Sequence, residues 1–269
     1  MARPLRAMIR RREPAFGTFV GEFDTPGMGH ILAAAGCDFA FLDMEHSGLT
    51  LASVKGAVRH YEAAGVALIV RPPSKAYDHI ARVLDTGAEG VCLPCVGSAE
   101  EARAIVASAK YPPAGERGIG LQLAHDNYVR GEVAAKLAAA NRRSCVVLQI
   151  ESAEGAENAD AIAAVPGVDA LWIGHYDLSA SLGIAGQFAH PDFLAAVRRA
   201  IDACKRHRRG LGMVVGSPEQ GLDMIGAGFN LIAYSGDVWL LRDALSAGID
   251  AMRDGARVRL GAETGRGKA

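Results

Sequence analysis

Charged side chains stand at the ends of several short apolar runs in this sequence, in a combination that could do chemistry. Glu151 ends the run CVVLQIE, Arg71 ends VALIVR, and His46 and Asp177 closely follow two further runs, in LDMEHS and WIGHYDLS. Carboxylates bind hard divalent cations, an arginine holds an anion, and a histidine moves protons near neutral pH. These residue types predict a reaction site if the fold brings them together.

The elements that must position these side chains alternate along the chain. Eight short runs are continuously apolar, which predicts strands buried on both faces. They cover residues 15–20, 38–44, 66–71, 90–96, 145–151, 169–174, 210–216 and 230–235. Between them lie stretches with apolar residues at helical spacing. These stretches cover residues 51–64, 77–86, 99–110, 156–164, 192–207, 218–227 and 239–253.

Eight buried strands that alternate with helices predict an α/β fold, a single (β/α)8 TIM barrel. We expect one domain over residues 1–269, with the barrel at about 15–253. The carboxyl ends of the strands carry the active site in such barrels. The four charged side chains are therefore expected to converge on one rim.

Two segments interrupt the alternation. Residues 111–143 predict a loop and an extra helix inserted between the fourth and fifth strands, which we expect on the side of the active site. Residues 255–269 are rich in glycine and charge, so a loose tail is expected there.

Composition narrows the class of protein. The net charge is −1 and 50% of the residues are apolar, which suggests neither a nucleic acid nor a membrane surface as a partner. No apolar run approaches the roughly 18 residues of a membrane span, so a soluble, cytoplasmic protein is expected.

Five cysteines in apolar segments fit small buried side chains in a reducing compartment. The Cys92 and Cys95 pair encloses a proline in a predicted strand and lacks a second Cys/His pair, which argues against zinc or redox chemistry.

Glu151 and Asp177 are 26 residues apart, about one strand and helix, which predicts adjacent strand ends. Two carboxylates so close repel each other unless a cation lies between them. A hard divalent cation that keeps several waters would satisfy both. The alternatives are a helix cap for Asp177 and a surface ion pair for Glu151.

Arg71, His46 and Asp85 each have two interpretations. An arginine that ends an apolar strand faces either an anionic ligand or a structural carboxylate. His46 follows Asp43 and Glu45, so it is either catalytic or simply held by hydrogen bonds. Asp85 ends a predicted helix, where the helix dipole disfavours a carboxylate. It therefore needs another partner, and a histidine is the obvious one.

Several motifs taken together resemble the class II, metal-dependent pyruvate aldolases of the HpcH/HpaI type. They are GCDFAFLDMEHS, RP after the third strand, LDTGAEGVCLP, GERGIG, LQIESAEGAENADAIAAVPGVDALWIG and DLSASLG. The resemblance keeps its order over roughly residues 15 to 240. It implies reversible cleavage of 4-hydroxy-2-oxoacids to pyruvate, or a pyruvate analogue, and an aldehyde.

The resemblance also implies roles for individual residues. Glu151 and Asp177 would ligate Mg²⁺ or Mn²⁺, and Arg71 would hold the 2-oxo oxygen of the substrate. His46 would be the base, with Asp85 as its support and Asp43 as a second candidate support. Substrate contacts are implied for Gln149, for Gly174, and for the main chain around Tyr176 and Asp177. Members of this family assemble into trimers or hexamers, so a homo-oligomer is expected and a supporting residue can come from a neighbouring chain.

The implied chemistry agrees with what these residues can do. A 2-oxoacid would chelate the cation, and cleavage would leave an enolate whose charge the cation and Arg71 face. His46 would take the proton of the C4 hydroxyl. Oxaloacetate decarboxylation, or a related lyase reaction, is the alternative because it forms the same enolate.

Other features keep further alternatives open. His175 stands where relatives commonly carry proline, either as a solvent-facing loop residue or as a contact to the substrate or the metal environment. A Schiff-base aldolase would need a lysine in the barrel mouth, and only Lys75 is close to Arg71 in sequence. A phosphosugar enzyme would use the turns VVGSP and YSGD, but neither is accompanied by a basic residue. A barrel that only binds a ligand would not need all four of Glu151, Asp177, Arg71 and His46, so their joint presence favours an enzyme.

Overall fold

Eight parallel strands close into one barrel, as expected. The computed structural model describes residues 5–266. Each strand pairs in parallel with the next, and the eighth pairs with the first. The strands are β1 (Ala15–Val20), β2 (Phe39–Asp43), β3 (Ala67–Arg71), β4 (Gly90–Leu93), β5 (Cys145–Ile150), β6 (Ala170–Ile173), β7 (Gly210–Val215) and β8 (Leu231–Gly236).

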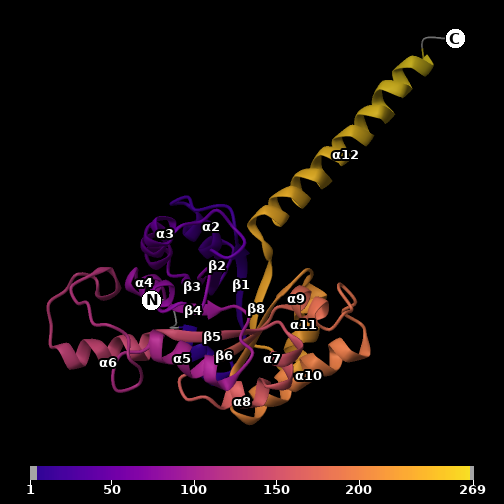
Figure 1. Ribbon diagram of the computed structural model, residues 1–269. Helices are drawn as coiled ribbons and strands as arrows, with labels where there is room; N and C mark the ends of the chain where they lie inside the picture. The colour runs from indigo at the N-terminus through magenta and orange to yellow at the C-terminus, as the bar shows by residue number, and fades with distance from the viewer. Residues whose placement is uncertain (1–4, 267–269) are drawn as a thin grey trace.

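Helices surround the barrel and follow its strands (Figure 1). Every predicted helix is present, although the stretch at 156–164 is divided into α7 and α8. The helices are α1 (Leu5–Arg11), α2 (Met28–Ala34), α3 (Leu51–Ala64), α4 (Tyr77–Asp85), α5 (Ala99–Ala109), α6 (Val133–Arg143), α7 (Ala153–Glu157), α8 (Ala159–Ala164), α9 (His175–Ser181), α10 (Pro191–Arg206), α11 (Pro218–Ala227) and α12 (Asp237–Arg266), with a 3-10 turn, η1 (Ala124–Asp126). Helices α1, α2 and α9 were not predicted from the sequence; α9 begins two residues after β6 ends, whereas α2 begins eight residues after β1 ends.

Serine caps begin several helices at the carboxyl rim of the barrel. Ser98, Ser152 and Ser217 each accept a hydrogen bond from the main-chain N–H three residues later, at the starts of α5, α7 and α11. Such a cap satisfies a helix N–H that has no partner within the helix. The loops that lead into these helices are short, at residues 94–98, 151–152 and 216–217. The caps therefore fix each helix start close to the end of the preceding strand.

Alternating strand residues form two hydrophobic layers. One layer packs between the barrel and its helices. The other fills the barrel interior and includes Phe39, Phe41, Ala67, Ile69, Val147 and Trp172. Continuing the inward rows of β2, β3 and β5 reaches polar side chains at the carboxyl rim. These side chains are Asp43 on β2, Arg71 on β3, and Gln149 and Glu151 on β5.

The amino end of the barrel is closed by α1. Its residues Leu5, Met8 and Ile9 are buried and belong to the interior hydrophobic layer. Arg6 pairs with the buried Asp169 at 2.8 Å next to this plug. The barrel is therefore sealed at one end, and chemistry is confined to the other.

The insertion predicted between the fourth and fifth strands is present but lies at the opposite end from the expected one. It runs from the end of α5 to the start of β5 and contains η1 and α6. A connection from a helix into a strand lies at the amino rim of a barrel, whereas the active site uses connections from strands into helices. The expectation that this insertion borders the active site is therefore wrong.

The C-terminal segment also differs from the expectation. Helix α12 does not end near 253 but continues to Arg266. The expectation of a loose tail is therefore wrong for residues 255–266. Residues 267–269 lie outside the described part of the chain. Figure 1 shows α12 leaving the barrel after β8 and projecting away from it, with no other element beside its outer part. Over residues 5–266, no helix is long and apolar enough to cross a membrane.

Candidate active site

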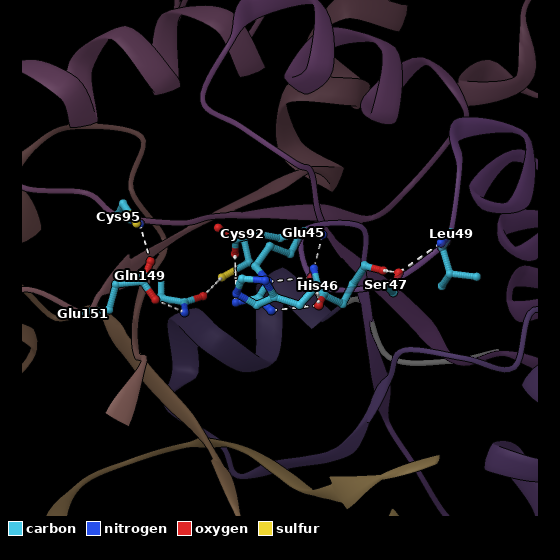
Figure 2. A network of polar contacts seen from close by, with 10 residues as sticks. Glu45, His46, Ser47, Leu49, Cys92, Cys95, Gln149 and Glu151 are labelled. Atoms are coloured by element: carbon cyan, nitrogen blue, oxygen red, sulfur yellow. Dashed lines mark hydrogen bonds and ion pairs between the residues drawn. The ribbon is translucent and has the colours of Figure 1, made fainter. Parts of the chain in front are cut away.

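Glu151 is a buried carboxylate at the carboxyl end of β5. Its Oε1 accepts a hydrogen bond from the main-chain N–H of Cys95 at 2.5 Å, and its Oε2 accepts one from the side-chain amide of Gln149 (Figure 2). The residue is only 5% exposed, and no ion pair joins it to a basic side chain within residues 5–266. Buried charges in proteins are paired or bind metals. This carboxylate therefore fits a cation.

Gly174 allows β6 to pass close to that carboxylate. A Cβ atom at Gly174 would lie 2.5 Å from Oε2 of Glu151 and 2.7 Å from the amide nitrogen of Gln149. Only glycine fits at this contact. Three residues later, Asp177 lies exposed in the first turn of α9, so it stands at the same rim as Glu151, as the sequence spacing predicted.

Asp43 and Arg71 form a buried ion pair at neighbouring strand ends. Nε of Arg71 donates to Oδ1 of Asp43 at 2.6 Å and Nη2 donates to Oδ2 at 2.8 Å. Nη1 of Arg71 lies 3.1 Å from Oε2 of Glu45. Burial alone would raise the pKa of Asp43, but the bonds and charge of Arg71 lower it overall. The structural carboxylate considered for Arg71 is therefore present, and its guanidinium is fixed at the rim.

His46 extends from the loop after β2, on the same rim. Its main-chain N–H donates to Asp43, whereas its ring Nε2 lies 3.8 Å from Oε2 of Glu45. The His46 side chain is 65% exposed, so its ring is open to a substrate. Figure 2 shows Glu45 and His46 on one side of Cys92 and Gln149, with Glu151 and Cys95 on the other. Asp43 thus holds the main chain at His46 rather than the imidazole.

Comparisons with known proteins show the family of this chain. The profile of the HpcH/HpaI aldolase/citrate lyase family matches residues 16–244. The chain belongs to this family. It is a carbon–carbon lyase, and the resemblance inferred from the sequence motifs is confirmed.

Named relatives within the HpcH/HpaI family are similar over most of their length. A hydroxypyruvate/pyruvate aldolase of Delftia acidovorans is 33% identical, covering 94% of this chain and 93% of that protein. A 2-keto-3-deoxy-L-rhamnonate aldolase of Salmonella typhi is 31% identical, with 92% of each chain covered. The crystal structure of an HpcH/HpaI aldolase from Desulfitobacterium hafniense DCB-2 is 32% identical, with a TM-score of 0.88 over 93% of this chain and 96% of that one.

Asp85 does not meet His46 within this HpcH/HpaI chain. It ends α4, and this helix runs from the carboxyl rim back to the amino rim. Its carboxylate instead binds the guanidinium of the buried Arg117, in the insertion. The expectation that Asp85 needs a partner is confirmed, but its partner in the same chain is an arginine. A contact between Asp85 and His46 would have to join two copies of the chain.

His175 and Tyr176 form an aromatic group at the start of α9. Their ring centroids are 4.5 Å apart, and the Phe188 ring lies 5.1 Å from His175 and 5.4 Å from Tyr176. Burial lowers the pKa of His175, so its ring favours the neutral form. Tyr176 is 68% exposed. His175 is therefore packed between two aromatic rings, not free in solvent as one alternative had it.

The two cysteines near the site lie in different surroundings. Cys92 points into the barrel, whereas Cys95 lies beyond the end of β4 and is exposed, so only one of the pair is in a strand. Partial burial, followed by the hydrogen bond and charge of Glu151, raises the pKa of the Cys95 thiol to about 12. That thiol stays protonated. All five cysteines are free.

Two contributions to the site were missed by the sequence analysis. Asp43 was considered only as a support for His46, although it lies two residues beyond Phe41 in the inward row of β2. That spacing could have identified it as the partner of Arg71. The main-chain N–H of Cys95 gives no sequence signal, because a hydrogen bond from the backbone is independent of the side chain.

Proposed function

We propose that this protein catalyses the reversible, divalent-cation-dependent aldol cleavage of 4-hydroxy-2-oxoacids to pyruvate, or a pyruvate analogue, and an aldehyde. The observation that carries the proposal is the buried Glu151 carboxylate, which has two N–H donors and no basic ion-pair partner among the described residues. It lies at the rim that also carries Arg71 and His46. The relatives named as aldolases support the same reaction.

Glu151 and Asp177 are the proposed ligands for Mg²⁺ or Mn²⁺. Within residues 5–266, no three His, Cys, Asp or Glu side chains surround one metal position. Two carboxylates suit a cation that takes its other ligands from water and substrate, as Mg²⁺ does. When bound, the cation supplies Lewis-acid stabilisation of negative charge on the ketone oxygen of a 2-oxoacid.

Arg71 is the proposed partner of that same oxygen. Its pairing with Asp43 uses Nε and Nη2, and its contact with Glu45 uses Nη1. A guanidinium carries five N–H donors, so donors remain for a substrate oxygen. Because two carboxylates fix its orientation beforehand, Arg71 meets the developing negative charge without first reorganising.

His46 is the proposed base for the C4 hydroxyl of the substrate. Its exposed ring can take that proton as the C3–C4 bond breaks and can return it in the condensation direction. We also propose Asp85 of a neighbouring copy as its support, because the Asp85 side chain is 38% exposed and lies at the far end of its own barrel.

The rest of the substrate is proposed to lie against Gln149 and the start of α9. The N–H of Gly174 donates to the carbonyl oxygen of Ile150, so the groups proposed to bind the substrate carboxylate are the main-chain N–H groups of Tyr176 and Asp177, in the first turn of that helix. The close approach of Gly174 to Glu151 supports a position for those groups beside the proposed cation.

An assay of pyruvate release tests the proposal. The protein is stripped with EDTA and supplied with Mg²⁺ or Mn²⁺, and 4-hydroxy-2-oxoacids are compared with oxaloacetate. We expect cation-dependent release from the hydroxyacids. Release from oxaloacetate alone would support the decarboxylase alternative, which the relatives named as aldolases do not favour. Borohydride with pyruvate should trap no lysine adduct, and a trapped adduct would contradict the mechanism.

A homo-oligomer, as a trimer or hexamer, is part of the proposal. Helix α12 carries exposed apolar side chains at Leu241, Leu245 and Ile249. On the barrel, Phe16 of β1 and Tyr234 of β8 are 49% and 41% exposed, although they lie on paired central strands. Such apolar surfaces mark association sites. Because α12 projects away from its own barrel (Figure 1), another copy is the natural source of cover for both surfaces.

Light scattering tests this assembly. We expect a mass of three or six chains for the wild type and a smaller species for the double variant Leu245→Asp/Ile249→Asp. The matched control is Arg253→Asp, on the same helix. A monomeric wild type would contradict the proposed assembly.

We also propose that the protein is cytoplasmic, because five free cysteines suit a reducing compartment.

A further inference from the structure

Lys75 is the lysine nearest to the site in sequence, and the aldolase chemistry gives it no role. It lies between β3 and α4, and its Nζ donates to Oε1 of Glu101 at 2.6 Å and to the main-chain oxygen of Cys95 at 2.8 Å. The ammonium is thus held by a carboxylate and a carbonyl. It is not presented as a free amine nucleophile.

Cys95 is held from both sides of its main chain. Its N–H donates to Glu151 at 2.5 Å, and its carbonyl oxygen accepts from Lys75. Its φ of 53° is in the left-handed region, which residues other than glycine seldom occupy. A non-glycine residue stays in that region when its surroundings fix it. This strained conformation is the one that directs the N–H toward Glu151.

Glu101 completes the arrangement. Its other oxygen, Oε2, accepts the N–H of Gly97 at 2.8 Å, two residues after Cys95. The loop of residues 94–98 is therefore held through Lys75 at Cys95 and through Glu101 at Gly97. Glu101 belongs to α5, whose first turn starts directly after this loop, so the ion pair joins the β3–α4 loop to a rigid helix.

We infer that Lys75 and Glu101 form a positioning pair, which fixes the main chain of Cys95 so that its N–H holds Glu151 in the orientation that binds the cation. The inference rests on the proposed cation site at Glu151. Lys75 touches neither substrate nor cation, and it acts through Cys95. Partners that orient a metal ligand commonly change metal affinity by about 10- to 100-fold when they are removed.

The experiment compares Mn²⁺ binding by electron paramagnetic resonance with hydrogen exchange of the peptide that contains Cys95. Lys75→Met should weaken Mn²⁺ binding by about tenfold and speed exchange at Cys95 in the cation-free protein. Lys75→Arg should restore both, because it keeps a cationic donor. The matched control is Lys55→Met, at an exposed position on α3, which should change neither.

Two substitutions at Cys95 separate its main chain from its thiol. Cys95→Gly keeps the N–H and suits the left-handed conformation, so Mn²⁺ binding should equal that of the wild type. Cys95→Pro removes the N–H and also forbids the left-handed conformation, because proline fixes φ at about −65°, so it should weaken binding more than Lys75→Met does. Unchanged Mn²⁺ affinity and exchange in Lys75→Met would overturn the inference while leaving the cation site intact. A wild type that binds no Mn²⁺ would instead overturn the proposed function.

Discussion

Arg71 and Asp43 are register partners on adjacent strands, and they meet through two parallel hydrogen bonds of 2.6 and 2.8 Å. Asp43 is fully buried, and the Arg71 side chain is 9% exposed. Because two such bonds fix the plane of a guanidinium, this pair determines where the remaining donors of Arg71 point. It links the packing of the barrel interior directly to the chemistry at its rim.

The first prediction concerns the pH dependence of this pair. Although burial opposes it, the pairing with Arg71 holds the pKa of Asp43 in the folded protein below its ordinary value, so the unfolded chain binds more protons as the pH falls. The stability that Asp43 contributes is therefore present above about pH 4 and is lost as the pH falls through the lower folded pKa. At neutral pH, Asp43→Asn should lower the free energy of unfolding by about 3 kcal/mol.

Urea unfolding of the wild type and Asp43→Asn between pH 3 and 7 measures this effect. The difference in unfolding free energy should shrink toward the acid end. A difference that stays constant across the whole range would show that Asp43 does not titrate with the lowered pKa.

The second prediction separates the roles of His46 and Arg71. Aldol cleavage requires removal of a hydroxyl proton, whereas oxaloacetate decarboxylation has no such proton to remove. His46→Ala should therefore slow aldol cleavage by at least about 10²-fold more than decarboxylation. Arg71→Ala should slow both by about 10²- to 10³-fold, because both reactions develop charge on the ketone oxygen.

Steady-state rates of both reactions for both variants decide this prediction, with thermal unfolding to confirm that Arg71→Ala is folded. If His46→Ala loses decarboxylation as severely as aldol cleavage, His46 is not the hydroxyl base.

The third prediction concerns the space beside Glu151. In Gly174→Ala the new Cβ would lie 2.5 Å from Oε2 of Glu151, so the carboxylate must shift. Metal affinity should fall by about tenfold or more, while the barrel still folds. Gly56→Ala on α3 is the matched control because a Cβ there meets nothing within 4 Å. Titration calorimetry with Mn²⁺ compares the two variants, and equal affinities would mean that Gly174 does not shape the site.

Much of the fold could be predicted because the strands are short, buried and separated by clear helix ends. The predicted strands agree with the observed ones to within three residues at either end. Helix α9 was missed because it is only one to two turns long and carries a packed aromatic pair, His175 and Tyr176, in place of an apolar stripe. Helix α12 was expected to end early because glycine-rich segments disfavour helix, yet Gly255 lies inside it.

The positions of candidate site residues could be predicted where these residues lie at strand ends. They could not be predicted where they lie on the segments that lead from a helix back to the next strand. Glu151 and Arg71 lie at the ends of β5 and β3, as expected from the apolar runs that precede them, and their roles stay predictions. Asp85 was assigned to His46 because a carboxylate needs a partner, but residue type alone does not show which rim a helix end reaches. Within one chain Asp85 binds Arg117, which comes from an insertion whose position was wrong, and its support of His46 from a neighbouring copy stays a proposal.

The central claim is that Glu151 and Asp177 hold the divalent cation on which aldol cleavage depends. Electron paramagnetic resonance of Mn²⁺ with the EDTA-stripped protein tests it most directly, alongside pyruvate release from the same samples. The account predicts Mn²⁺ binding and restored activity for the wild type, and loss of both in Glu151→Gln and in Asp177→Asn with the barrel still folded. Full activity in the stripped wild type, or unchanged Mn²⁺ binding in both variants, would contradict it.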